Sequence, residues 1–452
     1  MGVSLREWLH WLALHGSVRG AAAVGTRQND PLAQLFTDPA VRADPMSFYD
    51  EVRARGRLIR SRAGYLTADH SIAHELLRSD NFGAVEVGSD LPAPLRWLER
   101  HTRDGLLQPL RAPSLLAVDP PAHTRYRKPV SSVFTSKSVI ALRERIGRTA
   151  ETLLDQAAAD GATVDIASRY CSQLPVAVIT DVLGVGKGDR EQILKFGELS
   201  AYSLDFGLTW TQYQQMQRGL TWIGDWLADH VRRLRRCPGE DLVSELIHTA
   251  DSGDPEQHLD DRELQAIVGM LLVAGFETTV NLLGNGIRML LDAPENLQLL
   301  RQRPDLWPNA VEEILRLESP IQLTRRMAGT ETEVAGTAIR RGEVIVVGLG
   351  AANRDPTVFA DPHRFDIERT NTNRHLAFST GRHYCVGAAL ARIQGEVALR
   401  ALFERFPDVQ AAGVGSRRDS LVSRGWSSLP VTLGPARSAV EPCRDQTCTT
   451  AT

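Results

Sequence analysis

The chain has 452 residues, of which 42% are apolar and 24% are charged, proportions that are ordinary for a soluble globular protein. A formal net charge of −3 gives no reason to expect a nucleic-acid partner. Five scattered cysteines form neither a zinc-binding pattern nor a disulfide framework, which fits a reducing cytosol.

The N-terminal stretch over residues 3–24 is rich in leucine, tryptophan and alanine but is interrupted by arginine and histidine. It lacks the ~20 consecutive apolar residues that a membrane span needs, and no signal-peptide core is clear. We therefore expect no integral membrane segment. Residues 1–39 are predicted to be an amphipathic extension packed on the protein, with contact to a membrane surface as the alternative. Residues 435–452 are predicted to be a disordered polar tail.

The first part of the main body begins with a helical pattern over residues 45–55, which Gly56 ends. Two short strands are predicted next, at residues 58–60 and 65–67. Residues 83–118 contain several prolines and glycines and show little periodicity. They predict a long loop, and such loops are often functional.

The motif Asp-Pro-Pro at residues 119–121 opens a further predicted helix, because proline is tolerated in a first turn. His123 and Arg127 are four residues apart and so lie on one helical face, a geometry that suits binding of a carboxylate. The alternative is a solvated basic face. A cluster of aromatic residues between 196 and 226 is at helical spacing, which is more typical of a core than of a substrate box.

The longest predicted helix starts at a capping box formed by Asp260 and Glu263 and stops before Pro294. About 32 residues would give a rod of roughly 48 Å. Residues 266–275 are apolar on every side, so this part of the helix is predicted to be buried.

Within this helix lies the hexapeptide Ala-Gly-Phe-Glu-Thr-Thr at residues 274–279. A buried carboxylate at Glu277 is costly unless it has a partner or a purpose. The hydroxyl of Thr278 could bond back to a carbonyl four residues earlier, and Gly275 would leave a groove for a small ligand and water. The alternative is a helix kink with a satisfied glutamate.

The stretch from Phe378 to Gly387 holds a single cysteine, Cys385, followed by a helical pattern. A helix N-terminus offers free N–H groups and a positive dipole end, which favour a thiolate. Gly381 and Gly387 let the backbone turn sharply and approach a large flat ligand, and His383 supplies a donor to an anionic group. A buried, inert cysteine is the alternative.

The order F-x-x-G-x-H-x-C-x-G resembles the cysteine-ligand loop of the cytochrome P-450 haem-thiolate monooxygenases, with Ser379 where the family usually has glycine. The motifs H-x-x-x-R, A-G-x-E-T-T and E-x-x-R precede it in the family's order. The resemblance, to the soluble bacterial branch, covers about residues 40–434. It implies a mainly α, single-domain haem fold over 40–434 with a small β-rich subregion.

The resemblance also implies roles for individual residues. Cys385 would be the metal ligand, as the axial thiolate of haem b. Glu277 and Thr278 would be the catalytic acid–alcohol pair that activates oxygen. The residues implied in binding the cofactor are His123 and Arg127 at one propionate, Arg326 at the second, and His383 and Cys385 in the loop. Glu313, Arg316 and Arg364 would form a structural ion cluster, while Leu323 and residues 206–210 would face haem or substrate.

The function implied is a cytoplasmic monooxygenase that inserts one atom of dioxygen into a hydrophobic organic substrate. Electrons would come from NAD(P)H through a ferredoxin reductase and a ferredoxin, since the chain has no flavin or iron–sulfur signature. Arg125, Lys128 and Arg392 are predicted to form the basic ferredoxin-docking patch. Three alternatives are a peroxygenase, a haem sensor or carrier, and a cysteine-nucleophile hydrolase; the acid–alcohol pair disfavours the first two, and the position of His383 beside Cys385 disfavours the last.

Overall fold

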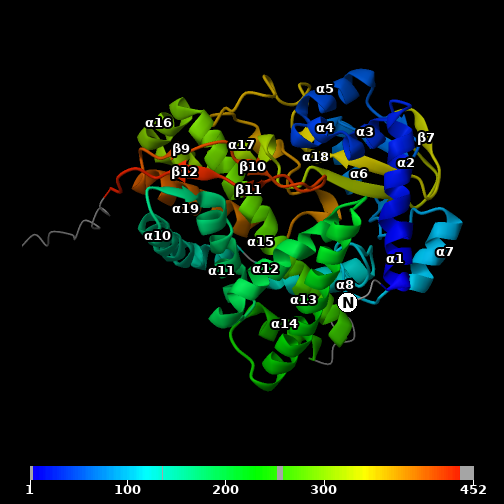
Figure 1. Cartoon of the computed structure of the whole chain (residues 1–452), viewed down its shortest axis with the longest axis horizontal. Coiled ribbons are helices and arrows are strands. Elements are labelled where there is room, and N and C mark those ends of the chain that lie inside the picture. Colours follow the sequence, from blue (N-terminus) through cyan, green and yellow to red (C-terminus); the bar gives the residue numbers. More distant parts are fainter. Residues whose placement is uncertain (1–3, 135, 252–257, 438–452) are drawn as a thin grey trace, which may run out of the picture.

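The computed structural model describes residues 4–134, 136–251 and 258–437, and these residues form a mainly helical protein with four small β-sheets (Figure 1). The helices of the first half are α1 (Leu5–Trp11), α2 (Ser17–Thr26), α3 (Pro31–Thr37), α4 (Pro39–Ala43), α5 (Met46–Arg55), α6 (His70–Arg78), α7 (Ala93–Thr102), α8 (Ala122–Val133), α9 (Ser136–Ala141), α10 (Arg143–Ala159), α11 (Gln173–Val182), α12 (Arg190–Ser200) and α13 (Trp210–Arg236). The later ones are α14 (Leu242–Ala250), α15 (Asp261–Asp292), α16 (Pro294–Gln302), α17 (Trp307–Leu317), α18 (Leu349–Ala352) and α19 (Ala388–Arg405). The mainly α prediction is confirmed.

The central helix of the molecule is α15, which crosses it in Figure 1 and packs against α11, α13, α17 and α19. Asp260 accepts a hydrogen bond from the backbone N–H of Glu263 (2.8 Å), and Glu263 accepts one in return from the N–H of Asp260 (3.1 Å), so the predicted capping box is confirmed. Among the described residues, one helix, α15, has the length and composition to cross a membrane. Its apolar window is 78% buried inside the protein, as in the core helix of a globular protein.

The strands are β1 (Ile59–Ser61), β2 (Gly64–Thr67), β3 (Phe82–Gly83), β4 (Thr163–Asp165), β5 (Leu323–Ala328), β6 (Thr332–Val334), β7 (Thr337–Ile339), β8 (Val344–Gly348), β9 (Gln410–Ala411), β10 (Ser416–Arg417), β11 (Trp426–Ser428) and β12 (Pro430–Thr432). The largest sheet has the order β1-β2-β8-β5-β3. Antiparallel pairing of β5 with β8 places Arg326 opposite Ile345. The two strands predicted before residue 70 are present: β1 is displaced by one residue at both ends, and β2 starts one residue earlier and ends where predicted.

One expectation about the first part of the chain is wrong in detail: the predicted long loop contains helix α7. Proline at the start of a helix costs little, since the first N–H groups have no partner within the helix. The rest of α7 gains stability from tertiary packing against α1, which sequence periodicity does not record. In Figure 1, α1 and α2 (blue) lie beside α7 (cyan) at one edge of the molecule. Of the predicted C-terminal tail, residues 438–452 lie outside the described residues.

A buried ion cluster joins α17 to the segment after α18. The guanidinium of Arg316 donates to both carboxylate oxygens of Glu313, at 2.7 and 2.8 Å. The third member is Arg369, which donates to Glu313 Oε1 at 3.1 Å, and not Arg364 as predicted. Arg364 is exposed and contributes only its carbonyl, which accepts from Arg316. The chain turns between the two arginines, so the side chain of Arg369 and not that of Arg364 points inward.

Candidate active site

The cysteine loop is held in a sharp conformation by its backbone. Gly381 has a φ of 71°, and a Cβ atom there would lie 2.5 Å from the carbonyl oxygen of Leu77, so no larger residue fits. The N–H of Cys385 donates to the carbonyl of Phe378 (2.9 Å) and closes the loop. The predicted sharp turn at Gly381 is therefore present.

Ser379 carries strain in the same loop. Its φ of 59° is in the left-handed region, where glycine is favoured and other residues cost roughly 1–2 kcal/mol. Its hydroxyl is buried and has no hydrogen-bond partner among the described residues. Glycine would remove both costs at this position.

The thiol of Cys385 faces an internal cavity, three residues before α19 begins. Cys385 has accessible surface, but protein encloses that surface, and burial raises the pKa of the thiol. The N–H of Gly387 and the cations Arg127 and Arg392 lower the pKa without outweighing burial. The helix end therefore favours the thiolate, as expected, but burial has the larger effect in the protein without a ligand. Coordination to a metal ion would deprotonate the thiol outright.

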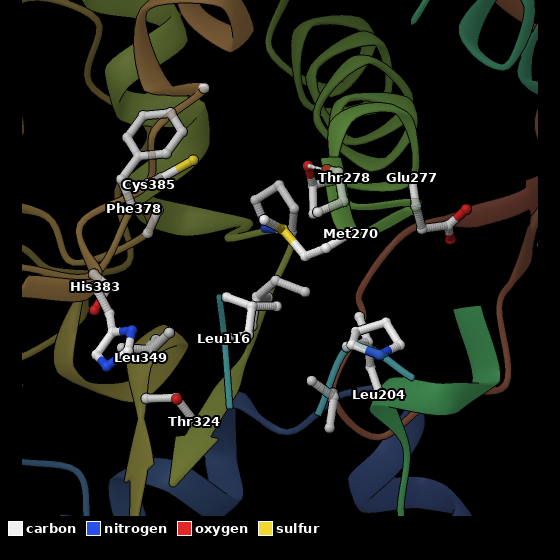
Figure 2. Close-up of a pocket in the computed structure, with 18 of the residues that line it drawn as sticks. Leu116, Leu204, Met270, Glu277, Thr278, Thr324, Leu349, Phe378, His383 and Cys385 are labelled. Carbon is white, nitrogen blue, oxygen red and sulfur yellow. Dashed lines mark hydrogen bonds between the residues drawn. The ribbon is translucent and has the colours of Figure 1, made fainter. Parts of the chain in front are cut away.

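The cavity beside Cys385 has a volume of about 350 Å³, and its walls are largely apolar. They come from the cysteine loop, α15, α8, β5 and the N-terminal helices. Figure 2 shows Cys385 on one side of the cavity and Thr278, on α15, on the opposite side. Apolar side chains that line it include Phe36, Leu116, Leu204, Met270, Leu323 and Leu421. The predicted position of Leu323 at the cavity is confirmed.

Two histidines predicted to bind the cofactor meet at this cavity. The rings of His123 and His383 are 4.5 Å apart between centroids, and the Nε2 atom of each is buried without a hydrogen-bond partner among the described residues. Burial lowers the pKa of both imidazoles, that of His123 to about 4. Two neutral rings with unused nitrogen atoms can donate to an anionic ligand.

The neighbouring residues Arg325 and Arg326 differ in ion pairing. Arg325 donates to Asp90 at 2.7 Å, so its charge is already neutralised. Arg326 is 6% exposed and donates only to Thr324 and to a backbone carbonyl; it has no ion-pair partner among the described residues. Burial lowers the pKa of Arg326 to about 10. The predicted choice of Arg326 over Arg325 as an anion ligand is favoured by this difference.

Arg127 also lines the cavity without an ion-pair partner in the described part of the chain, and its Nε donates to Ser131 (3.1 Å). A further charged residue beside His383 is Asp119, for which sequence analysis predicted no role at the site. Asp119 accepts from the N–H of Ala84 (3.0 Å) and lies 3.6 Å from His383 Nε2. Burial opposes its ionisation, but these groups outweigh burial and lower the pKa of Asp119.

The acid–alcohol pair lies on two different sides of α15. Thr278 donates to the carbonyl of Ala274 (2.9 Å), as predicted, and faces the cavity. Glu277 is 3% exposed, and its carboxylate points away from Cys385 in Figure 2. Its Oε1 lies 3.3 Å from the guanidinium of Arg418, while Oε2 has no hydrogen-bond partner within the described part of the chain. Burial raises the pKa of Glu277.

The expected groove at Gly275 needs a correction. A Cβ atom at this position would lie 2.9 Å from Ile179 on α11. The glycine therefore lets two helices pack closely, although it also lines the cavity. Arg418, the partner of Glu277, is 141 residues away in the sequence, and no local pattern pointed to it.

The aromatic cluster between residues 196 and 226 is mainly helix packing. Phe196 stacks on Trp222 with ring centroids 4.6 Å apart, between α12 and α13. Within the predicted contact segment 206–210, Phe206 lines the cavity, whereas Trp210 packs edge-on against Trp11. The structure also adds helix α3 to the cavity wall, through Leu32, Leu35 and Phe36, although the sequence analysis had assigned this segment to the extension outside the haem domain.

Comparison with known proteins places this site in a family. The family model for cytochrome P450 matches residues 299–412. The chain is 63% identical over 438 residues to "Putative cytochrome P450 140" of Mycobacterium tuberculosis, covering 97% of this chain and 100% of that protein. It is 44% identical over 321 residues to 6-deoxyerythronolide B hydroxylase of Saccharopolyspora erythraea, covering 70% and 76%.

Solved structures agree. P450BioI in complex with an acyl carrier protein ligated to hexadec-9Z-enoic acid has a TM-score of 0.80 at 31% identity, covering 87% of this chain and 100% of that one. CYP164A2 of Mycobacterium smegmatis has a TM-score of 0.79 at 33% identity, covering 89% and 99%. With a relative 63% identical over almost its whole length, this chain belongs to the cytochrome P450 family and is a monooxygenase.

Proposed function

We propose that Cys385 is the axial ligand of haem b, and that one atom of dioxygen is inserted into a hydrophobic substrate held in the cavity between Cys385 and Thr278. The observation that carries this proposal is the pairing of an apolar cavity with unpartnered cationic and donor groups at its edge. Apolar walls fit a macrocycle and a hydrophobic substrate, and cations without counter-ions fit the carboxylates of haem.

The residues around the cavity fit haem as follows. His123 and Arg127, one helical turn apart on α8, would bind one propionate. Arg326 would bind the second, with the donor nitrogen of His383 close by. A carboxylate would give the buried Nε2 atoms of His123 and His383 a hydrogen-bond partner, and it would give Arg127 and Arg326 the counter-ion that each lacks among the described residues. When bound, haem supplies the activation of dioxygen and the transfer of its oxygen atom to the substrate.

The chain's own contribution to oxygen chemistry is the supply of protons. The hydroxyl proton of Thr278 is directed to the Ala274 carbonyl, so the lone pairs of Oγ1 are free to hold a water in the cavity. Burial raises the pKa of the Glu277 carboxyl, and its Oε2 atom can carry a proton. Arg418 and the half-exposed Glu198, 3.7 Å from Arg418, connect Glu277 to solvent. Protons would enter along this side of α15 and reach Thr278 through water.

The electron donors are proposed to be a ferredoxin and its NAD(P)H-dependent reductase, with the reaction in the cytoplasm. Two of the three cations predicted to form the ferredoxin-docking patch are already ion-paired within the protein. Arg125 donates to Glu263 (2.8 Å), and Arg392 donates to Glu312 (3.1 Å). Lys128 is exposed and has no ion-pair partner among the described residues. It is therefore the best single cation for contact with an acidic ferredoxin.

The test of the ligand is spectroscopic. Reduced protein under carbon monoxide should show the strongly red-shifted Soret band of thiolate ligation, and Cys385→His should lose it. Cys171→Ala and Cys237→Ala are matched controls that should retain the band. A band that persists in the Cys385 variant would overturn the assignment. Consumption of dioxygen with added reductase and ferredoxin separates the monooxygenase from a peroxygenase or a haem sensor.

Proton delivery has its own test. Thr278→Ala should bind haem and substrate normally but divert reducing equivalents from product to hydrogen peroxide, because the water near the reacting oxygen loses its holder. Positioned proton transfer contributes typically about 10²–10⁴-fold. Thr279→Ala is the control, since its hydroxyl bonds to Gly275 at 3.4 Å and should matter much less. Full coupling of NAD(P)H to product in Thr278→Ala would show that protons arrive by another route.

A further inference from the structure

The connection between α12 and α13 passes over the cavity and is held by residues from the other end of the sequence. We call residues 205–210 the lid segment; Phe206 within it lines the cavity. The indole Nε1 of Trp11 donates to the carbonyl of Leu208 (2.9 Å), and Arg19 donates to the carbonyl of Gly207 (3.0 Å). These contacts join residues almost 200 positions apart.

A third bond uses a buried histidine as acceptor. The backbone N–H of Leu208 donates to His15 Nδ1 at 3.3 Å. Burial lowers the pKa of His15 to about 3, so the ring is neutral under ordinary conditions and Nδ1 keeps its lone pair. The N-terminal helices thus provide hydrogen-bond partners for three backbone groups of the lid segment: the carbonyl of Gly207 and both the N–H and the carbonyl of Leu208.

Side-chain packing extends the same interface to the cavity wall. The ring of Phe36, on α3, lies 6.5 Å from that of Phe206 in an edge-on arrangement, and both line the cavity. Arg325 lies 4.0 Å above the Phe206 ring centroid and is ion-paired to Asp90 in the turn before α7. Phe206 therefore contacts Phe36 of the N-terminal segment and also Arg325, which is ion-paired to the turn before α7.

The start of the lid segment is fixed separately. Asp205 is buried, and its Oδ1 accepts from the N–H groups of Leu421 (2.9 Å) and Val422 (3.0 Å). After Asp205, the lid segment is held by the N-terminal segment: Phe206 through its ring contact with Phe36, and Gly207 and Leu208 through hydrogen bonds. Opening of the cavity at Phe206 would therefore require the lid segment to separate from Trp11, His15 and Arg19.

We infer that residues 4–37 form a strap that holds the lid segment closed over the substrate cavity and controls how fast hydrophobic molecules enter and leave. The strap also supplies Phe36 to the wall, so it helps determine which substrates fit. This inference rests on the proposed function of the cavity. A helical extension that merely stabilises the fold would not need its polar groups directed at the lid backbone.

The test uses three variants of the haem-loaded full chain. Trp11→Phe keeps an aromatic ring but removes the Nε1–H donor, His15→Phe removes the acceptor, and Arg19→Met removes the bond to Gly207. Arg6→Met is the matched control, because Arg6 donates to the carbonyl of Thr102 (3.2 Å) on α7 and makes no hydrogen bond or ion pair with the lid segment among the described residues. Circular dichroism and the haem spectrum verify that each variant is folded.

The first readout is hydrogen exchange at the Leu208 amide. We expect it to be about tenfold faster in Trp11→Phe, His15→Phe and Arg19→Met, the factor that corresponds to the loss of one hydrogen bond in each, and unchanged in Arg6→Met. The second readout is stopped-flow absorbance of 4-phenylimidazole binding to haem. Association and dissociation should both become several-fold faster, with little change in Kd, since the open and closed cavity share one binding site.

Unchanged exchange at Leu208 in all three strap variants would overturn the strap. Faster exchange with unaltered ligand rates would also overturn it, because the lid segment would then not control entry. Equal effects in Arg6→Met would reduce the observation to general loosening of the N-terminal helices. Absence of any haem absorbance change with 4-phenylimidazole in the unmodified protein would instead count against the proposed function, and exchange at Leu208 would still decide whether the strap holds the lid segment.

Discussion

Two groups of buried charges in this protein are built in opposite ways. In the cluster behind the cysteine loop, Glu313 accepts from Arg316, from Arg369 and from the N–H of Asp366 (3.1 Å), while Arg316 also donates to the carbonyls of Asn353 and Pro362. Every polar atom has a partner. This cluster holds the chain together and has no capacity left for a ligand.

Around the cavity the reverse holds. Arg326 has no ion-pair partner in the described part of the chain, and the Nε2 atoms of His123 and His383 have no hydrogen-bond partner. Glu277 retains one unpaired oxygen. Burial of unsatisfied polar groups destabilises the protein, so it persists where a ligand completes the set. Within these two groups, the satisfied charges belong to the structural cluster and the unsatisfied ones line the cavity.

The largest expected effect comes from breaking the satisfied cluster. Glu313→Ala leaves Arg316 and Arg369 buried and unpaired, which should lower the free energy of unfolding by roughly 3–5 kcal/mol. Denaturant unfolding followed by circular dichroism measures this loss. Glu404→Ala is the control: its ion pair with Arg400 is on the surface and should contribute under about 1 kcal/mol. A Glu313→Ala protein as stable as the parent would show that the cluster is not structural.

Acid titration sharpens the same comparison through two glutamates. Glu312 is half-buried, which raises its pKa, but His375 and Arg392 outweigh this burial and bring the pKa to about 2 from an ordinary 4.5. Because the folded pKa is lowered, the paired carboxylate stabilises the fold above pH 4.5 by about 3 kcal/mol, and this is lost as the pH falls from 4.5 toward 2.

Glu312→Gln should therefore be less stable than the parent at pH 7 and should approach it only as the pH falls to about 2. Glu277→Gln should behave with the opposite sign. Its pKa is raised, so the ionised form costs stability above pH 4.5, and removing the charge should leave stability at pH 7 unchanged or higher. Urea unfolding at a series of pH values measures both. Parallel curves for the two variants would contradict the distinction between paired and unpaired carboxylates.

The cavity cations offer a smaller effect that reverses with haem. Arg326→Gln should not destabilise the haem-free protein, because an uncompensated buried charge is removed. The same variant should lose haem at least about tenfold faster, since a charge-assisted bond to a carboxylate contributes about 1.5–3 kcal/mol. Transfer of haem to excess apomyoglobin measures this rate. Arg316→Gln is the contrast, and should destabilise the protein with or without haem.

Sequence reasoning succeeded where function is encoded in a contiguous motif and failed where it depends on distant contacts. The loop around Cys385, the capping box at Asp260 and the back-bond of Thr278 are local, because their partners lie within a few residues. Arg418 beside Glu277 depends on how chain segments far apart come together. The identity of the third member of the ion cluster depends on tertiary structure in the same way. Arg369 and Arg364 lie on opposite sides of a turn, and only the side chain of Arg369 points inward.

The N-terminal helices show the same limit at a larger scale. Their composition predicts amphipathic packing, but which partner they meet is a tertiary property. Leu208 and Gly207 display no pattern that would identify His15 and Arg19 as their partners. The pKa of Cys385 is a related case: the helix end was visible in the sequence, whereas the burial that outweighs it was not.

The smallest expected effect concerns Ser379, where the site carries strain in its backbone as well as an unpaired hydroxyl. Ser379→Gly should raise the free energy of unfolding of the haem-free protein by about 1 kcal/mol, because glycine adopts the left-handed conformation without steric cost. The greater freedom of glycine in the unfolded chain offsets part of this gain.

Ser379→Ala removes the hydroxyl but keeps a Cβ atom at a φ of 59°, so it should gain less than glycine, and the difference between the two variants isolates the backbone strain. Gly381→Ala is the opposite control and should destabilise, because its Cβ atom would meet the carbonyl of Leu77. Denaturant unfolding with and without haem measures all three. If Ser379→Gly stabilises the haem-free protein but weakens haem retention, the hydroxyl acts on the cofactor, and Ser379 joins the functional set. If Ser379→Gly stabilises the haem-free and haem-bound proteins equally, the backbone strain at this position is independent of haem. The unpaired groups that serve the cofactor would then be only those able to bind an anion.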